Sequence, residues 1–267
     1  MIIFKYIYNR CNKGVIQMVL ASFVFLILTY VLMIFVNGLA NQMPLNGITT
    51  GDVSYKYPNL FQPAGVTFAI WGLIYLGLFV FILYQGAQLK QLDEITSKRL
   101  FININLLFSL IAILNMCWLF LWHYDRIALS TIVMVGLLIT LIVTFKIIDK
   151  DVLFIRSVVS LYLGWISVAL IANFTILLVK IGTPNLGNIA VSLTIIMIFI
   201  GGLITLLWTY KEKEYVFSFV ILWAYLGILL RHFRKENLDQ TYPMIQLSVL
   251  IMMISIISFD LFVVFKK

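Results

Sequence analysis

Charged residues are scarce in this sequence: they make up 11% of its 267 residues, whereas 63% are hydrophobic. In a soluble domain about a quarter of the residues are usually charged. The few charged residues of this chain could not provide enough polar surface to cover a water-soluble core. A lipid bilayer, by contrast, requires an apolar exterior. The net charge of +8 is spread singly or in small groups between apolar runs, so we do not expect nucleic-acid binding. The composition therefore predicts an integral membrane protein that is embedded in the lipid bilayer.

Cysteine and histidine are too rare for a disulfide framework or a metal site. The two cysteines, Cys11 and Cys117, fall in the N-terminal segment and in the middle of an apolar run. The two histidines, His123 and His232, stand alone near the ends of apolar runs. Zinc needs three or four grouped ligands, so we expect no metal site and interpret both imidazoles as interfacial.

Prolines and charges are nearly absent from the apolar runs. All five prolines lie in loops or where helices start, and Asp260 is the one acidic candidate inside a run, close enough to Lys266 to reach the interface. Secondary transporters commonly break helices at the bilayer midplane, and ion pathways need ionisable groups at depth. Both absences argue against an ion-coupled transporter.

The apolar runs are long enough to cross a membrane eight times. A spanning helix needs about 20 mostly apolar residues, and the seventh run is the shortest, ending in the polar sequence RHFRKENLDQ. The predicted fold class is all-α, a polytopic transmembrane helical bundle in which short connections make successive helices antiparallel neighbours. The predicted spans are residues 17–40, 63–84, 101–122, 127–148, 158–181, 189–210, 215–230 and 244–265.

The first run could also be a cleaved signal peptide, because basic residues precede it and Gly38-x-Ala40 resembles a cleavage site. Signal-peptide apolar regions are about 7–15 residues long, whereas this run has 24 residues, so we expect a retained helix. With the N-terminus inside, 13 of the 19 Lys and Arg residues lie on the inner side. The exception is the outer trio Arg231, Arg234 and Lys235. The positive-inside rule therefore predicts both termini in the cytoplasm, and we expect the inner membrane of a bacterial cell.

Aromatic and amide side chains recur at helical spacing in three of the predicted spans. Residues three and four apart share one helix face, and an amide in hydrocarbon needs a partner, so we expect Asn105, Asn115 and Asn173 to face the bundle interior. Such stripes often serve packing between helices, but they would also provide stacking surfaces and hydrogen bonds for a planar ligand. The stripes are Phe68, Trp71 and Tyr75; Asn115, Trp118 and Trp122; and Tyr162, Trp165, Ala169 and Asn173.

Three segments share a pattern of aromatic and amide residues: PNLFQPAGVTFAIWGLIY at 58–75, LNMCWLFLW at 114–122 and LYLGWISVALIANFTILL at 161–178. They resemble the TspO/MBR family of tryptophan-rich sensory proteins and translocator proteins, in the family's order and at the matching helices. The resemblance implies a five-helix bundle with a pocket that is closed by the loop after the first helix. We therefore divide the chain into a tail (1–16), a TspO-like bundle (17–181) and an additional three-helix segment (182–267).

The resemblance also implies where a ligand would bind. Trp71 and Trp165 match the two pocket tryptophans of the family, and Asn115, Tyr162 and Ala169 match other pocket-lining positions. Gln62-Pro63 stands where the family has Pro-Pro. The full set of predicted ligand-binding residues is Phe68, Trp71, Tyr75, Asn115, Trp118, Tyr162, Trp165, Ala169 and Asn173.

Two departures from the family concern the loop that closes the pocket. The family's loop tryptophan falls at Leu60, and its earlier Trp-Tyr pair falls near Gly51-Asp52. We therefore expect a lid without aromatic cover.

The function expected from these observations is a membrane-embedded binding or sensing protein for a hydrophobic planar molecule. A tetrapyrrole, such as a porphyrin or haem, fits the resemblance best, as a ligand and not as a required cofactor. Transport of a lipophilic metabolite is the alternative, followed by a light-dependent porphyrin-degrading activity. No catalytic constellation of the usual kinds is visible, so we do not expect an enzyme. Small residues such as Gly201, Gly202 and Gly227 leave a homodimer open.

Overall fold

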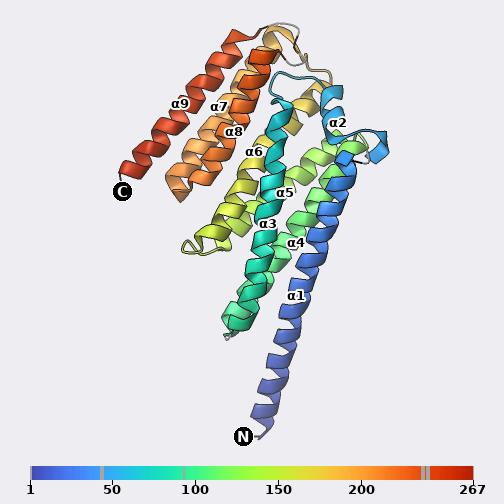
Figure 1. Ribbon diagram of the computed structural model, residues 1–267, viewed down its shortest axis with the longest axis vertical. Helices are drawn as coiled ribbons and strands as arrows, with labels where there is room; N and C mark the ends of the chain where they lie inside the picture. The colour runs from blue at the N-terminus through green and yellow to red at the C-terminus, as the bar shows by residue number, and fades with distance from the viewer. Residues whose placement is uncertain (1, 43–44, 93, 236–237, 239–240, 267) are drawn as a thin grey trace.

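The computed structural model describes residues 2–42, 45–92, 94–235, 238 and 241–266. All regular structure within these residues is helical, and eight of the helices are long and apolar enough to cross a membrane. The predicted all-α polytopic bundle is confirmed (Figure 1). The α-helices are α1 (Ile2–Gln42), α2 (Thr50–Lys56), α3 (Ile70–Gln88), α4 (Ile95–His123), α5 (Ile127–Ile147), α6 (Leu153–Lys180), α7 (Gly187–Glu212), α8 (Tyr215–Arg234) and α9 (Pro243–Phe265).

The helix bounds differ from the predicted spans at several places. Helices α4 and α6 begin earlier than predicted, at Ile95 and Leu153 instead of residues 101 and 158, and α8 ends later, at Arg234 instead of residue 230. Helix α1 begins at Ile2, so the described residues of the expected tail are helical. Helix α3 begins at Ile70 and follows a 3₁₀ helix, Gly65–Ala69, whereas the sequence predicted a helix from Pro63. A contact outside the segment accounts for the later start, because the Ala64 amide donates to the Gly227 carbonyl of α8 at 3.0 Å and Ala64 itself is extended, with φ −59° and ψ 148°.

The helices form an inner group and an outer group. In the inner group α1 packs along α4, α3 packs on α6, and α5 packs between α4 and α6. In the outer group α8 packs on α6, and α7 and α9 pack on α8 and on each other. Successive helices are therefore neighbours from α4 to α6, but α1 pairs with α4. The segment between α1 and α3 causes this, because it crosses the end of the bundle and includes α2 (Figure 1).

Both chain ends lie at the end of the bundle opposite α2 (Figure 1). An even number of spans requires this arrangement. Most of the Lys and Arg residues counted for the inner side lie at this end, while Lys267 falls outside the described residues. Arg231, which departs from the charge pattern, is 2% exposed and donates to backbone carbonyls. Its place on the outer side therefore follows from hydrogen bonds within the protein, to the carbonyls of Asn59 and Gln62.

The bundle interior contains the amides that the sequence placed there. Asn105 and Asn115 are fully buried and Asn173 is 2% exposed, which confirms that prediction. Asn105 donates to the Ser22 hydroxyl at 3.2 Å. All three glycines considered for a dimer face lie against side chains of the same chain: Gly201 faces Tyr225, Gly202 faces Met252 and Gly227 faces Thr67.

Acidic side chains of the outer helices have partners on neighbouring helices at the end that holds the termini. Glu212 of α7 pairs with Lys146 of α5 and lies 3.8 Å from a guanidinium nitrogen of Arg156 in α6. Asp260 of α9 accepts a hydrogen bond of 3.2 Å from the Ser218 hydroxyl of α8. The acidic residue of the last span therefore has a partner within the bundle.

Candidate ligand-binding site

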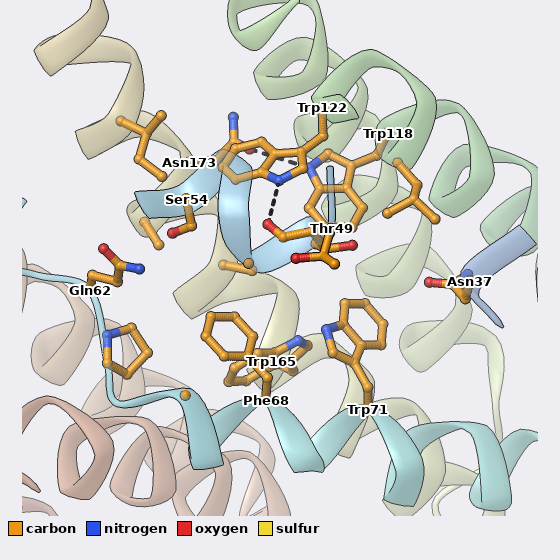
Figure 2. A pocket seen from close by; sticks show the side chains of 18 of the residues that line it. Asn37, Thr49, Ser54, Gln62, Phe68, Trp71, Trp118, Trp122, Trp165 and Asn173 are labelled. Atoms are coloured by element: carbon orange, nitrogen blue, oxygen red, sulfur yellow. Dashed lines mark hydrogen bonds between the residues drawn. The ribbon is translucent and has the colours of Figure 1, made fainter. Parts of the chain in front are cut away.

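A cavity of about 630 Å³ lies in the inner group of helices at the end away from the termini. Helices α1, α3, α4 and α6 form its walls, and the segment from Thr49 to Gly65 closes its outer end (Figure 2). Pockets of roughly 300–1,000 Å³ accommodate drug-sized ligands. The aromatic lining residues are Tyr55, Phe68, Trp71, Tyr75, Trp118, Trp122 and Trp165, and the polar ones are Asn37, Thr49, Thr50, Ser54, Asn59, Gln62 and Asn173.

Trp71 is the centre of the aromatic wall. Its ring lies 5.5 Å from Tyr75 and 6.3 Å from Trp118, stacked in both cases, and 6.2 Å from Trp165, edge to face. Phe68 meets Trp165 edge to face at 5.8 Å. Both stacked and edge-to-face pairs are favourable arrangements of aromatic rings. The helical spacing that produced the predicted stripes therefore gathers rings from three helices on one cavity.

Asn173 fixes the orientation of the Trp118 indole at the cavity wall. Its side-chain oxygen accepts from Trp118 Nε1 at 3.2 Å. Its side-chain nitrogen donates to the hydroxyls of Thr131 at 2.6 Å and Ser130 at 3.2 Å. The amide is thus satisfied inside the bundle, and α4, α5 and α6 are joined behind the cavity.

Asn115 and Tyr162 lie behind the cavity wall. Both are fully buried, and the Asn115 amide donates to the Tyr162 hydroxyl at 2.9 Å. Asn37 in α1 donates to the side-chain oxygen of Asn115 at 2.8 Å. The Tyr162 ring packs edge to face under Trp71 at 5.7 Å. These two residues support the wall without lining it.

The structure thus gathers seven of the nine predicted site residues on one cavity, with Asn115 and Tyr162 as the exceptions. The sequence missed Asn37, although a lone amide in an apolar helix is the signal that singled out the other three asparagines. It also missed the polar residues of the lid, because a loop lacks the periodicity on which the prediction relied. The seven are Phe68, Trp71, Tyr75, Trp118, Trp165, Ala169 and Asn173.

The lid is the segment 49–57, and α2 forms most of it. A capping box fixes its start: the Asp52 amide donates to the Thr49 hydroxyl at 3.2 Å, and the Thr49 amide donates to the Asp52 carboxylate at 2.8 Å. The Thr49 hydroxyl also donates to the Asp52 carboxylate at 2.7 Å, and the hydrogen bonds that the carboxylate accepts from the Thr49 hydroxyl and amide lower the pKa of Asp52. Tyr55 lies on the lid and lines the cavity, so the expectation of a lid without aromatic cover is wrong.

A single carboxylate ties the lid to the turn between α4 and α5. Asp125 accepts from Lys56 Nζ at 2.8 Å and from the Tyr57 hydroxyl at 2.9 Å, and Lys180 Nζ lies 2.9 Å from it. Burial raises the pKa of Asp125, but the hydrogen bonds from Lys56, Lys180 and Tyr57 outweigh it and lower the pKa to about 2. We call these four residues the latch.

The end of α4 also holds the lid. Trp122 Nε1 donates to the Thr50 carbonyl at 3.1 Å, and the His123 ring lies 3.4 Å from the Thr50 hydroxyl. His123 and His232 are both fully buried, so the interpretation of interfacial imidazoles is wrong for both. The Nε2 atom of each ring faces the segment that closes the cavity, at the Thr50 hydroxyl for His123 and at the Leu60 carbonyl for His232.

Helix α8 holds the rest of the closing segment. Arg231 donates to the Asn59 carbonyl at 2.7 Å and to the Gln62 carbonyl at 2.9 Å, and His232 Nε2 lies 2.9 Å from the Leu60 carbonyl. Leu60, at the family's loop-tryptophan position, is 1% exposed and does not line the cavity. The outer helices therefore determine the path of the cavity's closing segment.

The family model described as TSPO-like protein matches residues 23–262. The chain belongs to the TSPO-like family. The match runs through the three outer helices as well as the inner group, so it includes α8 and its contacts to the closing segment. The comparison with curated proteins gave no match, and neither did the comparison with solved structures. The described residues of the chain include eight apolar spans, so this is an integral membrane protein. Its family is associated with ligand binding or sensing in the membrane.

Proposed function

We propose that the chain binds a hydrophobic, planar small molecule in the cavity under the lid. The observation that carries the proposal is the cavity itself: about 630 Å³, bounded by four indoles and closed by a latched helix. Indole and phenol rings offer stacking surfaces, and the amides at the rim offer hydrogen bonds that orient a ligand. The bilayer would supply such a molecule directly.

A tetrapyrrole is the ligand class that we propose to test first, and metal-free porphyrins come ahead of haem. His, Cys and Met are common axial ligands of haem iron, and none of them occurs among the described residues that line the cavity. Only tyrosine phenols would remain for an iron. We therefore treat the porphyrin as a ligand and not as a required cofactor.

We further propose a binding role without catalysis. The described lining contains no carboxylate, imidazole, thiol or ammonium group, which are the usual agents of acid–base and nucleophilic chemistry. In the described part of the chain no three metal-ligating side chains gather. Binding and sensing therefore rank ahead of transport and of light-dependent degradation.

We propose that both termini face the cytoplasm, which places the lid on the opposite side of a bacterial inner membrane. The excess of Lys and Arg at the end that holds the termini supports this orientation. Labelling of single cysteines introduced at Tyr124 and at Asp151 in a cysteine-free variant would test it, because these residues lie on turns at opposite ends of the bundle. A membrane-impermeant maleimide added to intact cells should label position 124, and labelling of position 151 instead would reverse the assignment.

Titration of the detergent-solubilised protein with protoporphyrin IX, haem and a sterol tests the proposed function through tryptophan fluorescence. Saturable quenching is expected, with a dissociation constant that rises about tenfold in Trp71→Phe and Trp165→Phe. The matched control is Trp208→Phe, since Trp208 stacks on Phe217 at 5.3 Å, away from the cavity. Absence of saturable quenching by every probe, or equal affinity of all three variants, would overturn the proposal.

A further inference from the structure

Helix α8 joins the segment that closes the cavity to the opposite end of the bundle. At the cavity end, Arg231 donates to the carbonyl oxygens of Asn59 and Gln62, two residues that line the cavity. One helical stretch earlier, Trp223 Nε1 donates to the Thr67 carbonyl at 2.9 Å. A ligand that moves Asn59 or Gln62 therefore acts directly on α8.

The first two turns of α8 lie at the end of the bundle that holds the termini (Figure 1). They are roughly 20 Å from the cavity end of the helix, at a rise of about 1.5 Å per residue. There the Phe217 ring stacks on Trp208 of α7 at 5.3 Å. The Ser218 hydroxyl lies 2.7 Å from the Thr209 hydroxyl of α7 and donates to Asp260 of α9 at 3.2 Å. A displacement of α8 would therefore change its contacts with α7 and α9 far from the cavity.

Buried polar atoms without a hydrogen-bond partner among the described residues occur at both ends of α8. Near its start they are the indole nitrogen of Trp208 and the hydroxyl of Tyr215, and near its end they are the Thr67 hydroxyl and Nδ1 of His232. Leaving such groups unpaired is unfavourable, and most buried polar groups in proteins are paired. This cost reduces the free-energy difference to a second position of α8 in which any of these atoms is paired.

We propose that α8 couples the cavity to the opposite end of the bundle. Occupancy of the cavity shifts α8 through the closing segment, and the shift rearranges the contacts of α8 with α7 and α9 at the end that holds the termini. This inference rests on the proposed function and adds to it how a binding event is transmitted across the bilayer. It makes the outer helices the responding part of the protein, whereas the inner helices hold the ligand.

A substitution at the far end of α8 tests the coupling through ligand affinity, because coupling free energies are reciprocal. Ser218→Ala removes the hydroxyl that contacts Thr209 and Asp260. Its dissociation constant for protoporphyrin IX, measured by tryptophan quenching, should differ from that of the parent by about fivefold or more, the lower end of typical coupling. The control is Ser255→Ala, since the Ser255 hydroxyl donates to the Ile251 carbonyl of its own helix. Parent-like affinity of folded Ser218→Ala would overturn the inference and leave the proposed function standing.

A distance measurement separates coupling from a general loss of stability. Spin labels are placed in a cysteine-free variant at Asp151, in the turn between α5 and α6, and at Phe219, an exposed residue of α8. Saturation with protoporphyrin IX should change their mean distance by about 1–2 Å, the size of helix shifts in switching proteins. The control pair is Asp151 and Lys90, which both belong to the inner group and should keep their distance. With saturation shown by quenching, an unchanged distance between 151 and 219, or equal changes in both pairs, would overturn the inference alone.

Substitutions at the cavity end test the coupling without a ligand. Arg231→Leu removes the hydrogen bonds to the closing segment, and Trp223→Phe removes only the one to Thr67. Without porphyrin, both should change the distance between positions 151 and 219, whereas Arg126→Gln should not. Parent-like distances in both folded variants would overturn the inference. If protoporphyrin IX does not bind the parent, the proposed function fails, and the distances in these variants then decide whether α8 couples the two ends.

Discussion

Arg231 of α8 lies with its guanidinium nitrogen 2.7 Å from the carbonyl oxygen of Asn59, a residue that lines the cavity. The same nitrogen donates to the carbonyl oxygen of Gln62 at 2.9 Å. Arg231 and Asn59 are far apart in sequence, and Arg231 belongs to the outer group of helices. An outer helix therefore holds the segment that closes the inner cavity, and whatever displaces α8 would alter the cavity.

We expect Arg231→Leu to loosen the closing segment and weaken ligand binding. The substitution leaves two buried carbonyls without this donor, at a cost of about 1–3 kcal/mol each where water cannot replace it. Hydrogen exchange of residues 57–67 should accelerate, and the thermal midpoint should fall. The control is Arg126→Gln, an exposed arginine at the same end of the bundle. If exchange of residues 57–67 is unchanged in Arg231→Leu, α8 does not hold the segment.

The inner bundle could be predicted from the sequence because its signals are local. Apolar runs gave the spans, and helical spacing placed Trp71, Trp118 and Trp165 on one cavity. The closing segment could not be predicted, because its path depends on bonds to Arg231 and Gly227, far along the chain. Neither helical spacing nor the family resemblance separates residues that line a cavity from those one layer behind it, which is why Asn115 was placed in the lining.

Asn115→Leu is expected to destabilise the bundle although Asn115 does not line the cavity. It removes the acceptor of one Asn37 hydrogen bond, at 2.8 Å, and the donor to the Tyr162 hydroxyl, at 2.9 Å, while Asn37 keeps its hydrogen bond to the Met33 carbonyl. The loss should be about 1–3 kcal/mol in the free energy of unfolding. Chemical unfolding of Asn115→Leu, Tyr162→Phe and the double variant measures the coupling, which should be less than additive. Strict additivity would show that the two side chains do not act as a pair.

Asp125→Asn should weaken the latch, with a pH dependence set by the low pKa of Asp125. A carboxyl with a lowered pKa stabilises the fold above its ordinary value near 3.9, and this contribution is lost as pH falls toward the folded value of about 2. The thermal midpoint of Asp125→Asn should therefore lie below that of the parent by a constant amount from pH 5 to 8. The difference should vanish between about pH 4 and pH 2.

The latch is partly exposed, so its contribution is modest and sensitive to salt. Exposed ion pairs contribute little to stability, and at 1 M salt the difference between Asp125→Asn and the parent should shrink. Asp151→Asn, an exposed aspartate at the opposite end of the bundle, should show no comparable difference at any of these conditions. A difference for Asp125→Asn that persists unchanged at pH 2 would contradict the assignment of the latch.

Gly227→Ala should disrupt the contact between α8 and the 3₁₀ helix Gly65–Ala69, which precedes α3. A Cβ at this position would lie 2.0 Å from the Thr67 hydroxyl oxygen, so Thr67 or its backbone must move. The Thr67 carbonyl accepts from Trp223 at 2.9 Å and the Gly227 carbonyl accepts from Ala64 at 3.0 Å, and both bonds resist that movement. We expect a lower thermal midpoint, weaker porphyrin quenching and partial rescue by Thr67→Gly.

The control is Gly136→Ala. A Cβ at this position meets nothing within 4 Å, and the higher helix propensity of alanine should leave that variant as stable as the parent or slightly more stable. Equal midpoints for the two alanine variants would mean that α8 and the closing segment are not packed as tightly as the structure places them.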